Sequence, residues 1–221
     1  MRFAGFLAVF GLSLVGGFAY MNPKLVRAYM LPWIYGPVST INPTLQWPAE
    51  LNLPYPNLEL YTTSGEKVRL SKFRGKVLVI NSVAMASKSS QALSGGNLAG
   101  GLNDVVPQAD MQSFAEYFAA ATDSKFEDSR FQLIQVIYYG PDGVSAPTLE
   151  DAKQWAEHFG PVLPEGTEIL FADSSMLSRE TREMIPCFQL VDQNFVLRCD
   201  AGHPPRKDIF TDLMPLLELA L

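Results

Sequence analysis

The fold of this chain is decided by the stretch Gly75-Lys76-Val77-Leu78-Val79-Ile80-Asn81-Ser82-Val83-Ala84. Four apolar residues follow one another at 77–80, and a charged turn precedes them. A strand that is buried on both faces carries such a continuous apolar run, because neither of its sides meets water. We therefore predict that residues 76–83 form the buried central strand of an α/β sheet.

Further strands and helices are predicted on both sides of this stretch. We expect strands near 58–61, 68–70, 131–139, 169–171, 187–191 and 195–199. We expect helices from Pro107, from the capping-box pattern Thr148 and Asp151 up to Gly160, over 175–184, and from Pro205. In the helix after Thr148, five side chains are expected to face the core: Leu149, Ala152, Trp155, Ala156 and Phe159. Strands separated by helices predict a mixed sheet that is covered on both faces.

This order of elements resembles the thioredoxin-like superfamily in its peroxiredoxin and glutathione-peroxidase branch, over residues 52–221. Residues 65–77 are similar to the hairpin and first core strand of that branch. Ser82-Val83-Ala84 is similar to the small-residue turn ahead of its nucleophile, and residues 185–192 to its cis-proline loop and following strand. The resemblance implies a thioredoxin-like mixed sheet flanked by helices, with Pro186 as the cis-proline.

The site that the resemblance implies lacks its reactive group. Aligning Ser82-Val83-Ala84 places Ser87 where a glutathione peroxidase has cysteine or selenocysteine. A serine hydroxyl is a far weaker acid than a thiol and cannot pass through sulfenic acid. The glutamine and tryptophan of the family site are also absent from their motifs. The sequence therefore predicts no catalytic residue, and Ser87 is a vestigial nucleophile position.

Cys187 is the one reactive thiol that the sequence offers, because it directly follows Pro186. A thiol-dependent peroxidase or oxidoreductase that uses Cys187 is therefore the enzymatic alternative. Cys187 and Cys199 stand on the two arms of the predicted hairpin. Two buried thiols are the favoured interpretation, because cross-strand disulfide geometry is strained, and a disulfide between them stays open.

A copper-delivery role is a second alternative, through Met85, Cys187 and His203. The membrane-anchored copper-delivery proteins of this fold need a Cys-x-x-x-Cys pair, and Met85 and Ser89 stand at that spacing here. The chain has two histidines and two cysteines, and their spacing matches no metal-binding pattern. We predict neither a metal nor a cofactor.

The chain is predicted to begin with a membrane anchor over residues 1–21. Residues 3–21 carry no charge, and a helix of this length spans about 28 Å, close to the hydrocarbon thickness of a bilayer. The alternative is a signal peptide cleaved after Gly17-Phe18-Ala19, but the apolar run is longer than a usual signal-peptide core. We expect a single-pass membrane protein that binds lipid through residues 3–21.

A strap rich in proline and aromatic residues is predicted over residues 22–50, before a domain over 51–221. Seven prolines fall between residues 22 and 56, so this stretch cannot form long helices or regular strand pairs. Its rings include Tyr29, Trp33, Tyr35 and Trp47. These rings either lie at the lipid headgroups or contact a partner protein. We expect residues 22–56 to bind protein subunits of a membrane complex.

The charge of the chain argues against nucleic acid as a partner. The net charge is −6; residues 1–50 carry Arg2, Lys24, Arg27 and Glu50, a balance of +2, so the remainder carries −8. Phosphate binding needs clustered Lys and Arg, and we expect no such cluster in this chain.

These features predict a membrane-anchored, catalytically degenerate thioredoxin-like protein. Its expected work is that of an accessory or assembly subunit of a membrane complex of the respiratory or energy-transducing kind. The tail Leu190-Val191-Asp192…Leu197-Arg198 resembles one ATP-synthase assembly family, which implies the mitochondrial inner membrane. A bacterial periplasm-facing membrane is the alternative location.

Overall fold

The computed structural model describes residues 47–121, 129–201 and 208–220. The predicted anchor, strap residues 22–46, His203 and Pro205 lie outside the described residues. Within the described ranges, none of the helices has both the length and the apolar character of a membrane span.

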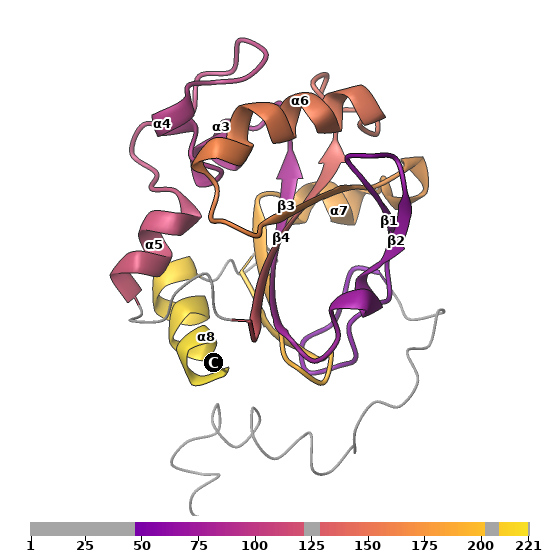
Figure 1. Cartoon of the computed structure of the whole chain (residues 1–221), viewed down its shortest axis with the longest axis vertical. Coiled ribbons are helices and arrows are strands. Elements are labelled where there is room, and N and C mark those ends of the chain that lie inside the picture. Colours follow the sequence, from indigo (N-terminus) through magenta and orange to yellow (C-terminus); the bar gives the residue numbers. More distant parts are fainter. Residues whose placement is uncertain (1–46, 122–128, 202–207, 221) are drawn as a thin grey trace, which may run out of the picture. The chain divides into compact units, whose positions relative to one another are not determined.

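Seven strands of the described chain form one mixed sheet in the order β2-β1-β5-β4-β3-β6-β7 (Figure 1). Neighbours among β5, β4 and β3 run parallel, whereas the pairs at both ends of the sheet run antiparallel. The strands are β1 Glu59–Thr62, β2 Lys67–Arg69, β3 Val77–Ala84, β4 Phe131–Tyr139, β5 Glu168–Phe171, β6 Cys187–Val191 and β7 Leu197–Asp200. The predicted mixed sheet is thereby confirmed.

The predicted central strand at residues 76–83 forms β3 in the middle of the sheet. β3 lies between β4 and β6, and its first seven residues are buried. Val79 and Val83 belong to apolar clusters on one face of the sheet, and Leu78 and Ile80 to a cluster on the other. The continuous apolar run therefore follows from burial on both faces.

Helices cover both faces. Four helices pack on the face of the sheet that carries Val79: α3 Lys88–Leu93, α5 Phe114–Ala121, α6 Leu149–Phe159 and α8 Met214–Ala220. Each contributes a buried apolar side chain, in the same order Leu93, Phe114, Trp155 and Leu217. The other face is covered by the helical turn η1 Leu70–Phe73 and by residues 47–58. The remaining helical segments are α4 Gly96–Ala99, η2 Gly160–Val162, η3 Ser174–Met176, α7 Arg179–Met184 and η4 Ile209–Leu213.

Two predicted helices have different boundaries in the structure. α5 begins at Phe114 and not near Pro107, because the Ser113 N–H donates to Glu116 Oε2 (2.7 Å) and the Glu116 N–H donates to Ser113 Oγ (3.3 Å). The helix predicted over 175–184 is interrupted after η3, and Ser178 caps the start of α7.

The predicted capping box of Thr148 and Asp151 is present at the start of α6. Trp155 and Phe159 on this helix are buried as expected. Leu149 was expected to face inward, but 36% of it is exposed, since it lies in the first turn, at the rim of the packed face. Gly160 ends the α-helix, and the chain continues as the short turn η2.

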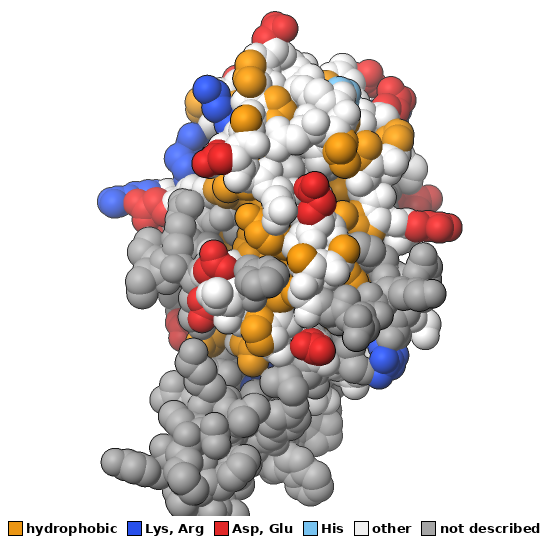
Figure 2. All heavy atoms as spheres, turned by 90° about the vertical axis from the view of Figure 1, so that its left-hand side faces the viewer, with side chains coloured by type: hydrophobic (Ala, Val, Ile, Leu, Met, Phe, Trp, Pro, Cys, Tyr) orange, Lys and Arg blue, Asp and Glu red, His pale blue; other side chains and the backbone are white. Residues whose placement is uncertain are grey.

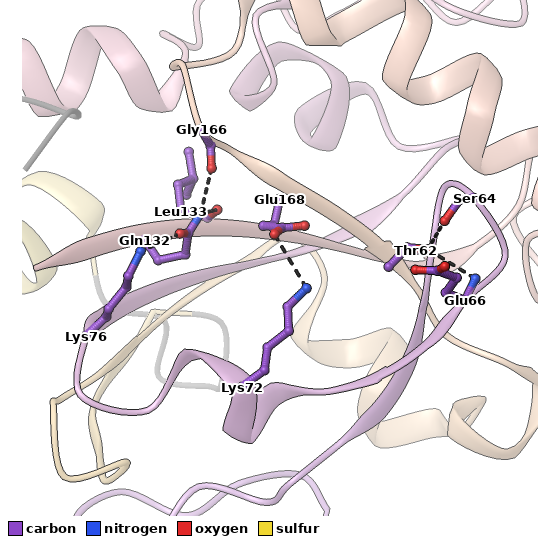
Figure 3. Close-up of polar contacts among 9 residues, drawn as sticks. All are labelled: Thr62, Ser64, Glu66, Lys72, Lys76, Gln132, Leu133, Gly166 and Glu168. Carbon is purple, nitrogen blue, oxygen red and sulfur yellow. Dashed lines mark hydrogen bonds and ion pairs between the residues drawn. The ribbon is translucent and has the colours of Figure 1, made fainter. Parts of the chain in front are cut away.

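The turn between β1 and β2 is closed by polar contacts (Figure 3). Thr62 Oγ1 lies 2.7 Å from Ser64 Oγ and accepts from the Glu66 N–H at 3.1 Å. Gly65 takes a positive φ of 87°, which suits glycine because it has no Cβ. The hairpin predicted around this turn is confirmed.

The face that carries α4, α5 and α8 shows apolar side chains scattered among Asp and Glu (Figure 2). Within the described part of the chain, Leu98 and Val106 are the most exposed large apolar residues, each 71% exposed. Single apolar side chains on a surface are ordinary and do not define a binding site.

Candidate functional site

Ser87 lies where the resemblance places a nucleophile, at the start of α3 directly after β3. Its hydroxyl serves as the helix N-cap, since Ser87 Oγ accepts from the Ser90 N–H at 3.2 Å. A serine that caps a helix in this way satisfies a backbone donor. The described residues place no imidazole or carboxylate in a hydrogen bond with Ser87 that would activate it. The geometry gives Ser87 a structural role.

Pro186 has the cis peptide bond that the sequence predicts. Cys187 follows it as the first residue of β6, opposite Ser82 of β3 in the strand register. Only 1% of Cys187 is exposed. Its thiol donates to Asp200 Oδ1 at 3.2 Å. Cys187 therefore lies near the carboxyl end of β3, where the resemblance places the reactive site, but it is buried.

Cys187 belongs to a buried polar cluster, which we define as Tyr55, Tyr138, Cys187, Gln189 and Asp200. The Tyr55 hydroxyl donates to Gln189 Oε1 at 2.7 Å, and Gln189 Nε2 donates to Asp200 Oδ2 at 3.3 Å. Burial raises the pKa of Tyr138 above its ordinary value, and the neighbouring Cys187 adds to this rise. Burial also raises the pKa of Tyr55, with further contributions from Tyr138, Cys187 and Asp200. Both phenols are therefore neutral at physiological pH.

This cluster is poorly suited to thiol chemistry. A nucleophilic cysteine acts as the thiolate and needs a partly exposed, electropositive environment. Here the Cys187 thiol donates to the Asp200 carboxylate, so loss of its proton would place two negative charges side by side. The described contacts of the cluster hold β6 and β7 in register, and the Asp200 contact disfavours the thiolate.

Trp47 closes the outer side of the cluster. Its ring stacks on Tyr138 with a centroid separation of 5.8 Å and meets Tyr55 edge-on at 6.4 Å. Its Nε1–H donates to Thr181 Oγ1 of α7 at 2.9 Å. Trp47 also packs against the apolar cluster of that face of the sheet. Trp47 therefore fixes the two tyrosines of the cluster from residues that precede β1.

The position of Trp47 corrects the predicted strap. Trp47 was expected to contact a partner, yet it packs inside the domain, and Tyr55 has no exposed surface. Pro54 also forms an isolated bridge with Val196. The chain packs into the domain from Trp47 onward because these rings find an apolar face on the sheet. Partner binding through residues 22–56 stays a prediction, and residues 22–46 of this segment lie outside the described residues.

Cys187 and Cys199 both remain as buried thiols and do not form the disulfide that the sequence left open. Cys199 pairs with Leu190 in the register and packs against the apolar cluster of α5 and α8. Cys187 instead bonds to Asp200 beside Tyr55. The two sulfur atoms therefore belong to different environments of the hairpin.

The copper-delivery alternative gains no support from the described residues. Met85 is buried in the cluster of Trp155 and Phe159, apart from the polar cluster that contains Cys187. The third proposed ligand, His203, lies outside the described ranges. Within those ranges, His, Cys, Asp and Glu form no group of three or more that would hold a metal ion.

Five cations stand between residues 67 and 76, which the prediction of no clustered Lys and Arg overlooked: Lys67, Arg69, Lys72, Arg74 and Lys76. Glu59 accepts from Lys67 (2.7 Å) and Arg69 (3.4 Å), and Glu168 accepts from Lys72 (3.5 Å; Figure 3). These carboxylates offset much of the positive charge. The absence of a nucleic-acid partner stays a prediction.

The site residues that sequence reasoning missed are Trp47, Tyr55, Tyr138, Gln189 and Asp200. Gln189 offered one signal, because it is a polar residue within an otherwise buried strand. Such a side chain needs a hydrogen-bond partner when it is buried. The sequence does not name that partner, since Tyr55 lies 134 residues away along the chain.

No protein-family model and no curated protein matches this chain. Solved structures do. A provisionally assigned electron transfer protein from Aquifex aeolicus VF5 superposes with a TM-score of 0.51 at 12% identity, covering 78% of this chain and 99% of the other. A provisionally assigned protein disulfide isomerase from Bacteroides thetaiotaomicron superposes with a TM-score of 0.51 at 14% sequence identity, covering 80% of this chain and 93% of the other.

The C-terminal domain of a provisionally assigned thiol-disulfide oxidoreductase from Bacteroides thetaiotaomicron gives the same TM-score of 0.51 at 15% identity, covering 78% of this chain and 96% of that domain. At such low identity, these likenesses show the fold alone. The chain thus has a thioredoxin-like fold, as the sequence predicts. The likenesses do not bear on the glutathione-peroxidase branch or on activity.

Proposed function

We propose that this protein is a catalytically degenerate thioredoxin-like protein that serves as an accessory or assembly subunit of a membrane complex. One observation carries the proposal. The start of α3, where the resemblance places a nucleophile, holds Ser87 as a helix cap, and the Cys187 thiol on the neighbouring strand β6 is buried against Asp200. A domain built in this way offers surfaces for binding and no exposed thiol at this site.

The membrane assignment rests on the uncharged run at residues 3–21, which has the length of a bilayer span. The mitochondrial inner membrane is the proposed location, on the resemblance of the tail to an ATP-synthase assembly family. A bacterial periplasm-facing membrane is the alternative. The contact with partner subunits is assigned to residues 22–46, which carry Tyr29, Trp33 and Tyr35.

A thiol oxidoreductase that works through Cys187 is the second candidate. Two observations favour it: Cys187 directly follows the cis-proline, and three solved structures of similar fold carry redox descriptions. This activity would require the buried Cys187 to become accessible and its proton to leave despite the adjacent Asp200. The first candidate needs neither step.

The purified full-length protein is expected to show no turnover as a peroxidase or disulfide reductase. The physical reason is that Ser87 has no thiol and that Cys187 is buried against a carboxylate. The measurement is peroxide consumption with glutathione or thioredoxin, and insulin reduction, for the wild type, Ser87→Ala and Cys187→Ser. Turnover that Cys187→Ser abolishes and Ser87→Ala preserves would establish the second candidate.

The accessory role is tested through the aromatic residues of the strap. Replacing Trp33 together with Tyr35 by alanine is expected to release the protein from its complex while it stays in the membrane, because buried aromatic anchors often contribute about 2 kcal/mol or more each. The measurement is co-purification from native membranes, followed by sizing of the complex. Ser87→Ala is the matched control and should assemble normally. Assembly that survives the strap change but not the Ser87 change would identify the vestigial site as the docking surface.

A further inference from the structure

Residues 95–111 form a loop that the rest of the domain holds in place through Gln91. This side chain has no exposed surface, and its Nε2 donates to the Met85 carbonyl at 2.7 Å and to the Leu102 carbonyl at 3.0 Å. Its Oε1 accepts from the Leu102 N–H at 2.8 Å. Both backbone groups of Leu102 are therefore bound to one buried side chain, which fixes the loop relative to the end of β3.

The two ends of the loop also contact each other. Asn97 Nδ2 donates to the carbonyls of Gln108 at 3.2 Å and of Met111 at 2.8 Å. A Cβ on Gly96 would lie 2.8 Å from Pro107 Cγ, so α4 packs directly against Pro107. The loop is therefore a compact unit, and its outer side chains have fixed positions.

The tip of this loop is a turn at which folding alone would favour glycine. Asn103 and Asp104 both take a positive φ, 54° and 58°. The Val105 N–H donates to the Leu102 carbonyl at 3.2 Å and closes the turn. Positive φ at both central residues is typical of the I′ turn, in which Asn followed by Gly is preferred. Asn103 fits this preference, whereas Asp104 stands where glycine would be less strained. Strain of this kind is commonly retained where a side chain has a function.

The outer side chains of the loop are apolar and acidic. Leu98 and Val106 are each 71% exposed, and Asp104 and Asp110 are exposed beside them in the sequence. Neither carboxylate has an ion pair within the described ranges, and residues 89–121 contain no Lys or Arg. Figure 2 shows apolar and acidic side chains together on the face that carries α4. Exposed apolar side chains alone are ordinary, but here a fixed loop presents them together with uncompensated negative charge.

We propose that residues 98–110 are a docking surface for a partner subunit, and that the docked segment carries Lys or Arg beside apolar side chains. The cation pairs with Asp104 at the tip, and the apolar side chains cover Leu98 and Val106. Charge complementarity decides this choice, because a negative surface without cations disfavours an acidic segment and an anionic lipid surface. The inference rests on the proposed function and gives the complex a contact besides residues 22–46.

Photo-crosslinking of the full-length protein in native membranes tests the occupant. A benzophenone amino acid replaces Leu98 or Val106, and mass spectrometry sequences the crosslinked peptide. The expected product is a peptide of another protein in which Lys or Arg stands beside apolar residues. The same reagent in place of Leu149 on α6 is the control and should not give this product. A peptide of a second copy of this chain, an acidic peptide, a lipid adduct or no adduct would each overturn the proposal.

Asp104→Gly separates a docking role from a folding role. Glycine relieves the strain of the turn, so the melting temperature is expected to stay the same or to rise by up to about 4 °C. The yield of the crosslink from position 98 is expected to fall by about two- to fivefold, because the carboxylate is lost. Asn103→Gly is the matched control, since it changes the same turn, keeps Asp104 and should leave the yield unchanged.

Three outcomes of this comparison contradict the docking surface. A lower melting temperature for Asp104→Gly would show that the carboxylate serves the turn. A yield that Asp104→Gly leaves unchanged, or that Asn103→Gly lowers equally, would show that the carboxylate binds no partner. Co-purification remains the separate test of the accessory role. A complex that assembles while position 98 gives no adduct would therefore refute the docking surface alone.

Discussion

Replacing Asp192 with alanine is expected to destabilise the protein by about 3–5 kcal/mol, because it removes one partner of a buried ion pair. Arg198 Nε donates to Asp192 Oδ2 at 2.7 Å, and only 8% of the Arg198 side chain is exposed. Asp192 Oδ1 also accepts from the N–H groups of Asn194 and Val196, each at 3.0 Å. Without Asp192, the guanidinium would remain buried with no counter-charge in contact among the described residues, and the β6–β7 turn would lose two bonds.

The measurement is denaturant unfolding of the full-length protein, with Asp192→Asn and a double variant as controls. Asp192→Asn keeps an oxygen for the two backbone donors and should lose less stability than alanine. The double variant Asp192→Ala with Arg198→Met should recover part of the loss, since an apolar side chain replaces the uncompensated charge. A cost below about 1 kcal/mol for Asp192→Ala would contradict the importance of this pair.

This ion pair changes how the tail is interpreted. Asp192 and Arg198 are two of the residues on which the resemblance to an ATP-synthase assembly family rests. Their contacts close the β6–β7 hairpin, where the register shifts between Leu190 and Val191 opposite β7. A folding requirement is therefore sufficient to explain both residue types. The assignment to a membrane complex consequently depends on the strap and on the co-purification experiment.

Replacing Trp155 with alanine is the second large expected effect, with a loss of about 3–5 kcal/mol. The Trp155 ring is fully buried, lies 4.3 Å from the Phe159 ring and donates to Gln135. Gln135 Nε2 in turn donates to Ser94 Oγ at 2.9 Å, just after α3. One indole therefore connects α6 to β4 and, through Gln135, to the end of α3. Alanine would leave both a cavity and an acceptor without its donor.

Two further variants of α6 calibrate this result. Trp155→Phe fills most of the cavity but still deprives Gln135 of its donor, so a loss of about 1–3 kcal/mol is expected. Leu149→Ala lies on the same helix at a half-exposed position and should cost less than about 1 kcal/mol. The readout is again the free energy of unfolding. A Trp155→Ala protein as stable as Leu149→Ala would show that α6 does not depend on this contact.

The helices and strands that were predicted correctly are those whose formation depends on residues close together in the sequence. β3 follows from an unbroken apolar run, and the α6 start follows from Thr148 and Asp151, three residues apart. Where a competing local signal was overlooked, the prediction was wrong: the pair Ser113 and Glu116 starts α5, and Pro107 does not. The helix α3 and the capping role of Ser87 were not predicted.

What the sequence by itself determined is thus the thioredoxin-like order of strands and helices and the cis-proline at Pro186. Only the tertiary structure decided that Trp47 packs into the domain and that Cys187 is buried against Asp200. The contacts responsible, Trp47 with Thr181 and Tyr55 with Gln189, each join residues 134 positions apart. Periodicity and capping act over a few residues, whereas the partner of a buried polar group is chosen by the packing of the whole sheet.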